Sequence, residues 1–361
     1  MKRISIILTT AALLCTGCAK TVESGIYDDD VRYLKAWLKA DHSDIEIDIA
    51  RNAETGLPDT LGRGVYLLSE KKVKDGTEVK KGDYVTLSYT VTDLEGNIST
   101  YTEESTAKKL RQYSKPNYYG PKVVSTVSGE NYAGVIDAIV GMKTGEERTV
   151  LVPKWLMSTK DSASEEDYLS ASSSSSHAIY SIRLTGIIED IGKHQIDEIE
   201  KYLKDNVIGK MQLENGKVVE KVDTTGTKEA CRGFYFIPVT DTTGHRKFPS
   251  DTTVNINYTG KRLDGQAFDT TIERVAKDND IWSLSASYGT KSVTWGESFS
   301  EIQLGGSSVI SGFSRTLWQM NAGKGIGIFW SDLGYGSSGS GNMIPGYAPL
   351  IFEIEIVGEE N

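Results

Sequence analysis

Cysteine is scarce in this sequence: three residues, Cys15, Cys18 and Cys231, occur among 361. Cys15 and Cys18 lie together near the N-terminus, which leaves Cys231 alone in the rest of the chain and argues against a disulfide framework. Cys15 and Cys18 have the spacing of a redox pair, but they lie in a segment with the features of a processing signal. A thioredoxin-like role is therefore not expected.

The motifs of several enzyme classes are missing as well. The sequence has four histidines, and they are scattered without metal-ligand spacing: His42, His177, His194 and His245. No Gly-x-Ser-x-Gly motif occurs, which argues against a hydrolase of that type. The glycine-rich stretch 323–327 lacks the Gly-Lys-Ser/Thr ending of a phosphate-binding loop and leads into a strand pattern rather than a helix. We therefore expect no metal and no cofactor.

Positive charge is in deficit. The formal net charge is −10 at pH 7, and loss of an N-terminal leader with Lys2 and Arg3 would make it more negative. This balance argues against nucleic acid as a partner. The hydrophobic share of 38% and the charged share of 25% are those of soluble globular material, and 361 residues are enough for two domains.

The apolar run at the N-terminus, residues 4–15, is too short to span a bilayer as a mature helix. It follows two basic residues and precedes Thr16-Gly17-Cys18, which resembles the end of a bacterial lipobox. We interpret residues 1–17 as a lipoprotein signal peptide, Cys18 as the lipidated first residue and residues 18–31 as a tether. An ordinary signal peptide, cut after a small residue, is the alternative. The lipid would anchor the protein in the bacterial cell envelope, and we expect the outer membrane.

The remaining chain contains an internal duplication. Four pairs of short motifs recur at one offset of 169 residues: Tyr33-Leu34-Lys35 with Tyr202-Leu203-Lys204, Arg63-Gly64 with Arg232-Gly233, Tyr89-Thr90 with Tyr258-Thr259, and Leu94-Glu95-Gly96 with Leu263-Asp264-Gly265. Chance can give one such pair, whereas four pairs at one offset indicate duplication. The period is too long for a solenoid, so the pattern predicts tandem domains.

Each copy has the pattern of an α+β domain, in which an antiparallel sheet wraps over a short helix. Apolar residues three and four apart predict a leading helix over 31–38 and another over 196–203. Alternating strands and a short helix that ends at a glycine follow in both copies. These patterns place domain 1 at residues 32–190 and domain 2 at residues 191–361, with a linker near 190–195.

Two stretches interrupt the pattern. The serine-rich stretch 170–176 predicts a flexible loop of domain 1. In domain 2, residues 270–298 form an addition of its own between two expected strands. Trp282, Tyr288 and Trp295 make this addition too aromatic for a disordered insert. We expect it to fold against the rim of a pocket.

Domain 2 carries a series of motifs in a fixed order before its last apolar strand. They are Tyr258-x-Gly260, Asp264-Gly265-x-x-Phe268-Asp269, Val309-Ile310-x-Gly312-Phe313, Gly334-Tyr335-Gly336 and Ile344-Pro345. This order resembles the FKBP family of peptidyl-prolyl isomerases. The resemblance implies two tandem FKBP-like domains and, together with the lipobox, an organisation similar to that of tandem-domain lipoproteins of Bacteroidetes-like bacteria.

The resemblance also implies which residues act. Those implied in catalysis are Tyr258, Phe268, Asp269, Ile310 and Tyr335, and those implied in substrate binding are Val309, Phe313, Ile344 and Phe352. The expected hydrogen-bond donors are the backbone N–H of Ile310 and the hydroxyl of Tyr335, while Asp269 would order the polar edge beside Tyr258. Taken singly, such residues on alternating strands are more often plain core, and only their order favours a site.

Domain 1 departs from the family pattern at most pocket positions. Tyr89 remains, but the other positions change: Ser99-Thr100 stands for Phe-Asp, Asn131-Tyr132 for Val-Ile, Val135 for the aromatic floor and Met157-Ser158 for Tyr-Gly. We expect this domain to keep the fold and to be inactive, as a spacer or a binding module. Domain 2 departs less: Phe313 stands where tryptophan usually forms the floor, and Gly346 replaces the usual second proline.

The sequence leads to one main hypothesis and two alternatives. The main hypothesis is a membrane-tethered isomerase whose domain 2 acts on X–Pro bonds in exported polypeptides. The first alternative is a non-catalytic envelope lipoprotein that binds proline-containing or unfolded polypeptides. The second is a structural lipoprotein with filled pockets, which would be favoured if Trp282 or Trp295 packed into the pocket of domain 2.

Overall fold

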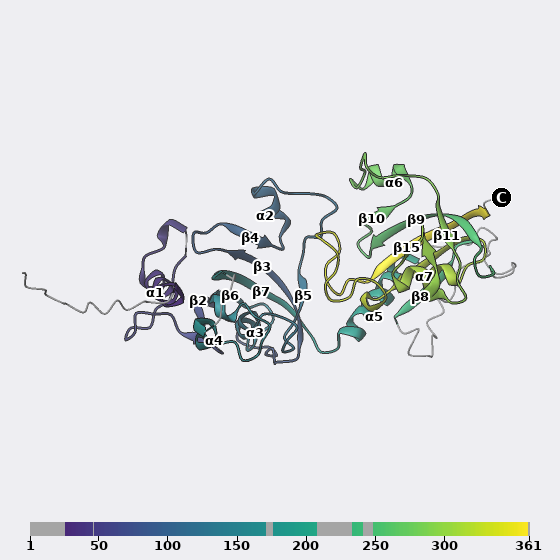
Figure 1. Cartoon of the computed structure of the whole chain (residues 1–361). Coiled ribbons are helices and arrows are strands. Elements are labelled where there is room, and N and C mark those ends of the chain that lie inside the picture. Colours follow the sequence, from purple (N-terminus) through teal and green to yellow (C-terminus); the bar gives the residue numbers. More distant parts are fainter. Residues whose placement is uncertain (1–25, 46, 171–175, 208–232, 241–247, 360–361) are drawn as a thin grey trace, which may run out of the picture.

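The computed structural model describes residues 26–45, 47–170, 176–207, 233–240 and 248–359. The expected leader, Cys18, Cys231 and most of the serine-rich stretch lie outside the described residues. The described chain forms two antiparallel sheets, one before and one after helix α5 (Ile191–Tyr202) in the sequence (Figure 1). This confirms an α+β chain of two tandem domains. Within the described ranges, no helix combines the length and the apolar character needed to cross a membrane.

Domain 1 consists of the elements before α5. Its helices are α1 (Ile26–Lys39), α2 (Glu104–Lys109), α3 (Ala133–Ile139) and α4 (Glu165–Ser170), with short 3-10 turns η1 (Ser43–Ile45) and η2 (Lys154–Leu156). Its strands are β1 (Thr60–Leu61), β2 (Val65–Lys71), β3 (Tyr84–Thr92), β4 (Ile98–Tyr101), β5 (Lys122–Ser125), β6 (Glu147–Val152) and β7 (Ala178–Ile188). The strand order is β1-β2-β6-β7-β3-β4, and β5 also pairs with β3.

Domain 2 begins with α5 and its π-helical end η3 (Leu203–Val207). Its other helices are α6 (Glu273–Asp278) and α7 (Ser311–Trp318), with the 3-10 turns η5 (Phe299–Glu301) and η6 (Ser331–Leu333). Its strands are β8 (Phe234–Pro238), β9 (Thr253–Arg262), β10 (Ala267–Thr270), β11 (Lys291–Thr294), β12 (Gln303–Leu304), β13 (Ser307–Ser308), β14 (Gly323–Phe329) and β15 (Leu350–Glu359). The strand order is β13-β12-β11-β9-β15-β14-β8, and β10 also pairs with β9.

The two domains share one topology. The order β2-β6-β7-β3 in domain 1 recurs as β8-β14-β15-β9 in domain 2, and each central strand also carries two short partners. The repeat extends into the stretch 270–298, because α6 and β11 lie 169 residues after α2 and β5. The expectation that domain 2 alone carries this stretch is therefore wrong. The aromatic residues that suggested an insert belong to a segment common to both copies.

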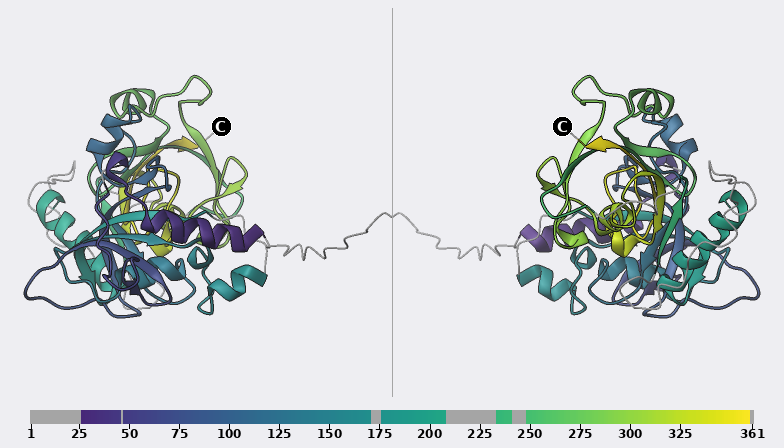
Figure 2. Two further views of the ribbon diagram at one scale, coloured as in Figure 1. Left: turned by 90° about the vertical axis from the view of Figure 1, so that its left-hand side faces the viewer. Right: turned by 90° about the vertical axis from the view of Figure 1, so that its right-hand side faces the viewer.

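Each sheet packs one face against a short helix, and Figure 2 shows the sheet of domain 2 curving around α7. The close approach depends on glycine. A Cβ at Gly312 of α7 would lie 2.3 Å from the ring of Phe329, which is fully buried on β14. In domain 1, a Cβ at Gly134 of α3 would lie 2.4 Å from Val152. Only a residue without a side chain permits either contact.

Both leading helices start earlier than the apolar spacing predicts. Helix α1 begins at Ile26, so it takes up part of the tether expected over 18–31. Helix α5 begins at Ile191, where the Asp190 side chain accepts a hydrogen bond of 2.8 Å from the backbone N–H of Lys193 and caps the helix. The expected linker near 190–195 is therefore largely helical.

The domains contact each other through the loop before β15, which lies against the chain between α2 and β5 (Figure 1). Arg262 at the end of β9 is 6% exposed. Its guanidinium donates to the carbonyl of Pro116 in domain 1 at 2.9 Å and to the carbonyl of Met343 in domain 2 at 2.6 Å. The ring of Tyr118 lies 5.6 Å from the same guanidinium. One buried cation thus fixes the loop of domain 2 against domain 1.

Candidate active site

Four aromatic rings from four elements of domain 2 meet in one group, called the aromatic cluster below. They are Tyr258 on β9, Phe268 on β10, Phe313 on α7 and Phe352 on β15, and none is more than 8% exposed. The ring centroids lie 5.2 Å apart for Phe313 and Phe352, and 5.3 Å apart for Phe313 and Tyr258. Phe268 lies 5.7 Å from Phe352. All three pairs are edge-to-face, the favoured geometry for aromatic rings, so the cluster is well packed.

Strand register and one glycine bring these rings together. On the paired strands β9 and β15, Gly260 lies opposite Phe352, two residues along the strand from Tyr258. A Cβ at Gly260 would lie 2.7 Å from the ring of Phe268 and 2.9 Å from that of Phe352. The glycine of the Tyr-x-Gly motif therefore leaves space on the strand for both rings.

One ring of this core was absent from the predicted site. Phe329, on β14, stacks on Phe352 with centroids 5.8 Å apart and an interplanar angle of 6°. The sequence of β14 contained a signal for this packing: glycines alternate at 323, 325 and 327, and glycines on one face of a strand allow a helix to approach closely. A Cβ at Gly327 would lie 1.8 Å from the hydroxyl oxygen of Thr316 on α7. Phe329 is two residues after Gly327, so its side chain lies on the same face of β14, where it packs against Phe352 of the cluster.

Two tyrosine hydroxyls and a carboxylate form a polar edge beside the rings. The hydroxyl of Tyr258 donates to Oδ2 of Asp269 at 2.8 Å. The ring of Tyr335, which is 36% exposed, stands edge-on to Phe268 at 6.5 Å. Burial, and then the charge of Asp269, raise the pKa of both tyrosines. Both hydroxyls therefore stay protonated at neutral pH and act as donors.

The start of α7 contributes a backbone donor. Ile310 is the N-cap residue, with φ −61° and ψ 147°, and its carbonyl accepts from Ser314. Its N–H has no acceptor among the residues that the structure describes. Val309 and Ile310 are half-buried and pack against the core that contains the aromatic cluster. The N–H of Ile310 is thus left available beside an apolar wall.

Ile344 comes to the same core from the loop before β15. It is 3% exposed, and its backbone exchanges two hydrogen bonds with Ser340, of 2.8 and 3.1 Å. Gly339, at φ 64°, passes so close that a Cβ there would lie 2.2 Å from the carbonyl oxygen of Ile344. A tight, glycine-dependent turn therefore holds Ile344 in place.

The two tryptophans of the 270–298 stretch lie in different surroundings. Trp295 is 3% exposed and packs on Phe248, with ring centroids 4.8 Å apart. Trp282 is 40% exposed, and its Nε1 donates to Glu273 of α6 at 3.2 Å. Within the described residues, neither ring is paired with a ring of the aromatic cluster. Trp295 nonetheless belongs to the same buried core as the aromatic cluster, whereas Trp282 lies at the surface.

All nine predicted site residues of domain 2 thus lie in one region, seven in a single apolar core and two at its polar edge. The profile of the family described as FKBP-type peptidyl-prolyl cis-trans isomerase matches residues 244–357, which include the whole region. FK506-binding protein 1A of Aspergillus fumigatus is 33% identical over 109 residues, which cover 30% of this chain and 78% of that protein. The chain belongs to the FKBP-type peptidyl-prolyl cis-trans isomerase family.

Further relatives and a solved structure match other shares of the chain. FK506-binding protein 2 of Dictyostelium discoideum is 32% identical over 113 residues, covering 31% of this chain and 68% of that protein. The short-type peptidyl-prolyl cis-trans isomerase of Methanocaldococcus jannaschii is 35% identical over 75 residues, covering 21% and 47%. Among solved structures, a peptidyl-prolyl cis-trans isomerase of Pseudomonas syringae matches with a TM-score of 0.28 and 21% identity, covering 47% of this chain and 94% of that one.

Proposed function

We propose that domain 2 of this FKBP family member catalyses the cis–trans isomerisation of X–Pro bonds in polypeptides, with a proline ring held against the aromatic cluster. One observation carries the proposal: two hydrogen-bond donors lie beside buried rings without an acceptor of their own. They are the N–H of Ile310 and the hydroxyl of Tyr335, and neither is bonded among the described residues. Both donors therefore remain available to a substrate carbonyl at the edge of the apolar core.

The chemistry requires no bond to be made or broken except the partial double bond of the amide. Rotation about an X–Pro bond meets a barrier of roughly 18–20 kcal/mol, because amide resonance is lost in the twisted state. The planar amide is more dipolar than the twisted one. An apolar surface therefore destabilises the starting state relative to the twisted state. Each 1.4 kcal/mol of such preference accelerates the reaction about tenfold.

Side chains and one backbone N–H of domain 2 would supply the rest of the preference for the twisted amide over the planar one. The N–H of Ile310 and the hydroxyl of Tyr335 would donate to substrate carbonyls and hold the backbone in its twisted form. Asp269 accepts from Tyr258 at 2.8 Å and so fixes the polar edge of the cluster. Phe268, Phe313 and Phe352 would contact the proline ring. The remaining predicted residues, Val309 and Ile344, would wall the site.

Two observations support placing the activity in domain 2 alone. The family profile matches residues 244–357, which belong to that domain. In domain 1, the positions of Phe268, Asp269 and Tyr335 are taken by Ser99, Thr100 and Met157. Domain 1 thus lacks the aromatic wall, the carboxylate and the hydroxyl donor.

The cellular setting is proposed from the sequence. A leader at residues 1–17 and lipidation of Cys18 would tether the protein to the bacterial envelope, in the outer membrane. The substrates would then be exported polypeptides that contain proline. Uncatalysed isomerisation takes tens of seconds or more, so an isomerase at the membrane would shorten a slow step of their folding.

The test uses the full chain in a refolding assay limited by proline isomerisation. We expect wild-type protein to accelerate refolding and Tyr335→Phe to lose most of that acceleration, because the variant keeps the ring and removes only the donor. Tyr288→Phe is the matched control, since its hydroxyl accepts from the backbone of Ser283 on a surface loop. If wild-type protein binds the refolding chain without accelerating it, the non-catalytic alternative replaces this proposal.

A further inference from the structure

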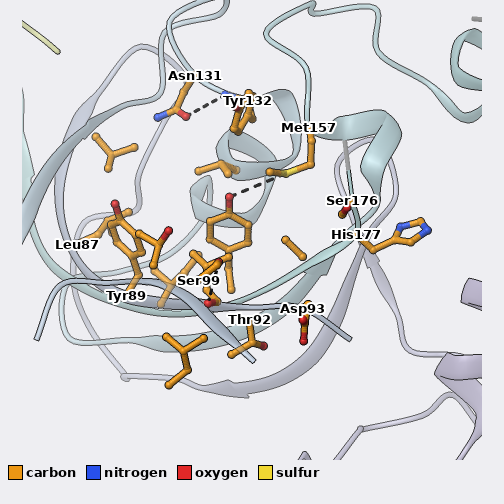
Figure 3. Close-up of a pocket in the computed structure, with 18 of the residues that line it drawn as sticks. Leu87, Tyr89, Thr92, Asp93, Ser99, Asn131, Tyr132, Met157, Ser176 and His177 are labelled. Carbon is orange, nitrogen blue, oxygen red and sulfur yellow. Dashed lines mark hydrogen bonds between the residues drawn. The ribbon is translucent and has the colours of Figure 1, made fainter. Parts of the chain in front are cut away.

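Domain 1 has a cavity of about 600 Å³ on the face that corresponds to the aromatic cluster of domain 2 (Figure 3). Strands β3, β4, β5 and β7 and helix α3 contribute lining residues, together with Met157, which follows the turn η2. Pockets that bind small molecules in proteins typically measure roughly 300–1,000 Å³. The cavity therefore has the size of a binding site, in the domain whose catalytic residues are missing.

Two missing rings open this cavity. Ser99 takes the place of Phe268, and Val135 takes the place of Phe313, because each follows the same glycine or strand position in its domain. In domain 2 both phenylalanines are buried and fill the corresponding space. The loss of two phenyl rings on one face leaves a void that the small replacements do not fill.

Two tyrosine side chains line the void, and their hydroxyls have either a weak hydrogen-bond acceptor or none among the described residues. Tyr89 matches Tyr258, but Thr100 stands where the carboxylate partner would be, and the Tyr89 hydroxyl has no partner in the described part of the chain. Tyr180 takes the position of Phe352, since β7 pairs with β3 as β15 pairs with β9. Its hydroxyl has only the sulfur of Met157, at 3.9 Å, which is a weak acceptor. Both hydroxyls can donate to an incoming group.

The lining does not favour a charged occupant. Asp93 is at the cavity, but its carboxylate already accepts from the backbone of Glu95 and from the backbone and side chain of Asn97, at 2.8–3.0 Å. His177 lies at the rim with its ring turned away from the centre (Figure 3). Burial lowers the pKa of His177 to about 4, so it is neutral near pH 7. The other polar residues of the lining, such as Thr92, Ser99 and Asn131, carry no charge, and the rest of the lining is aliphatic or aromatic, so an uncharged, largely apolar group fits it.

The mouth of the cavity indicates how that group is presented. Strand β4 is the last strand in the sheet order, and Ser99 and Thr100 on it are exposed at the cavity. No other strand within the described ranges pairs with its outer side. An open strand edge beside a side-chain pocket is how an extended polypeptide is commonly bound.

We propose that this cavity, called the tyrosine cavity after Tyr89, Tyr132 and Tyr180, binds a bulky aromatic side chain of an extended polypeptide. The ring occupies the space of the two missing phenyl groups, and the hydroxyls of Tyr89 and Tyr180 donate to a peptide carbonyl beside it, that of Tyr180 in place of its weak bond to Met157. The void is wide enough for a ring system larger than proline. This site is separate from the proposed isomerase site and does not depend on its activity.

Binding is measured on the full chain by fluorescence anisotropy with peptides Gly-Ser-Xaa-Ser-Gly that carry fluorescein at the C-terminus, where Xaa is Trp, Phe, Pro or Ala. We expect the Trp peptide to bind at least tenfold tighter than the Ala peptide. Val135→Phe and Ser99→Phe refill the cavity from a helix and from an exposed strand position, and each lowers that affinity at least tenfold. Ser105→Phe, on the exposed surface of α2, is the matched control and leaves it unchanged.

Two results overturn the proposal: equal affinity for the Trp and Ala peptides, or Trp affinity within twofold of wild type in both refilled variants. The site is located with the same peptide carrying p-benzoylphenylalanine at Xaa. Crosslinks to Met157 or Tyr132 are expected, whereas crosslinks confined to domain 2 contradict the assignment. The isomerase assay on Val135→Phe separates the two sites. If this variant loses peptide binding and keeps its refolding activity, the substitution has affected domain 1 alone.

Discussion

The hydrogen bond between Tyr258 and Asp269 gives the sharpest test of the site geometry. Tyr258 is 8% exposed, and its hydroxyl donates to a charged oxygen at 2.8 Å. Hydrogen bonds to charged groups contribute about 1.5–3 kcal/mol to stability. Because Asp269 is exposed to solvent, we expect this bond to contribute an amount near or below the lower end of that range. A double-mutant cycle with Tyr258→Phe, Asp269→Ala and the pair is therefore expected to give a coupling free energy of about 1–1.5 kcal/mol.

The assay is urea unfolding of the full chain labelled with fluorotryptophan, followed by ¹⁹F NMR. The resonance of Trp295, which is buried in domain 2, reports that domain, and the resonance of Trp155 reports domain 1. The coupling should be seen at Trp295, while the midpoint at Trp155 stays the same. Additive effects of the two substitutions would refute the bond, and with it the ordered polar edge on which the proposed mechanism relies.

Three further predictions follow from single contacts. Gly312→Ala places a methyl group against the ring of Phe329 and should destabilise domain 2 by about 1–3 kcal/mol, seen as a lower midpoint at Trp295; an unchanged midpoint would contradict the close helix packing. The unfolding free energy should fall as pH drops from 6.5 to about 4, because His177 stays neutral in the folded state while the unfolded chain takes up a proton; His177→Gln should flatten this slope, and an unaltered slope would assign it elsewhere. Arg262→Leu should speed hydrogen–deuterium exchange in residues 342–349, since it removes the bonds that hold this loop to domain 1; equal exchange would show that the joint does not depend on this cation.

The repeat and the grouping of the site residues were predictable because both depend on short motifs and on the order of these motifs along the chain. Four motifs at one offset fixed the duplication, and the motifs around Phe268, Ile310 and Tyr335 named residues that the fold brings together. Alternating strands and glycines constrain which side chains share a face, so motif order carries three-dimensional information.

Other features depend on contacts that no local pattern contains. The start of α5 was missed because Gly192 weakens the helix signal, whereas in the fold a Cβ there would lie 3.0 Å from Trp330. In the same helix, Gln195 accepts a hydrogen bond of 2.7 Å from Ser331. The joint at Arg262 connects residues 146 positions apart in the sequence. Tertiary packing decides both.

The tyrosine cavity shows a further limit of sequence patterns. The changes to Ser99 and Val135 were visible and were interpreted as loss of the proline site. Whether lost ring volume is filled by neighbours or remains open depends on how far the surrounding strands can move. In domain 1 the strands remain apart, and a cavity is present at the positions that match the aromatic cluster of domain 2.

In the proposed function, the aromatic cluster of domain 2 takes a proline ring and accelerates rotation of its peptide bond. Exchange NMR on a short Ala-Pro peptide, with the full chain at substoichiometric concentration, tests this most directly. We expect exchange peaks between the cis and trans forms that grow with protein concentration, disappear with Phe268→Ser and persist with Val135→Phe. Exchange no faster than in buffer alone, in wild-type protein whose folding is intact, would contradict it.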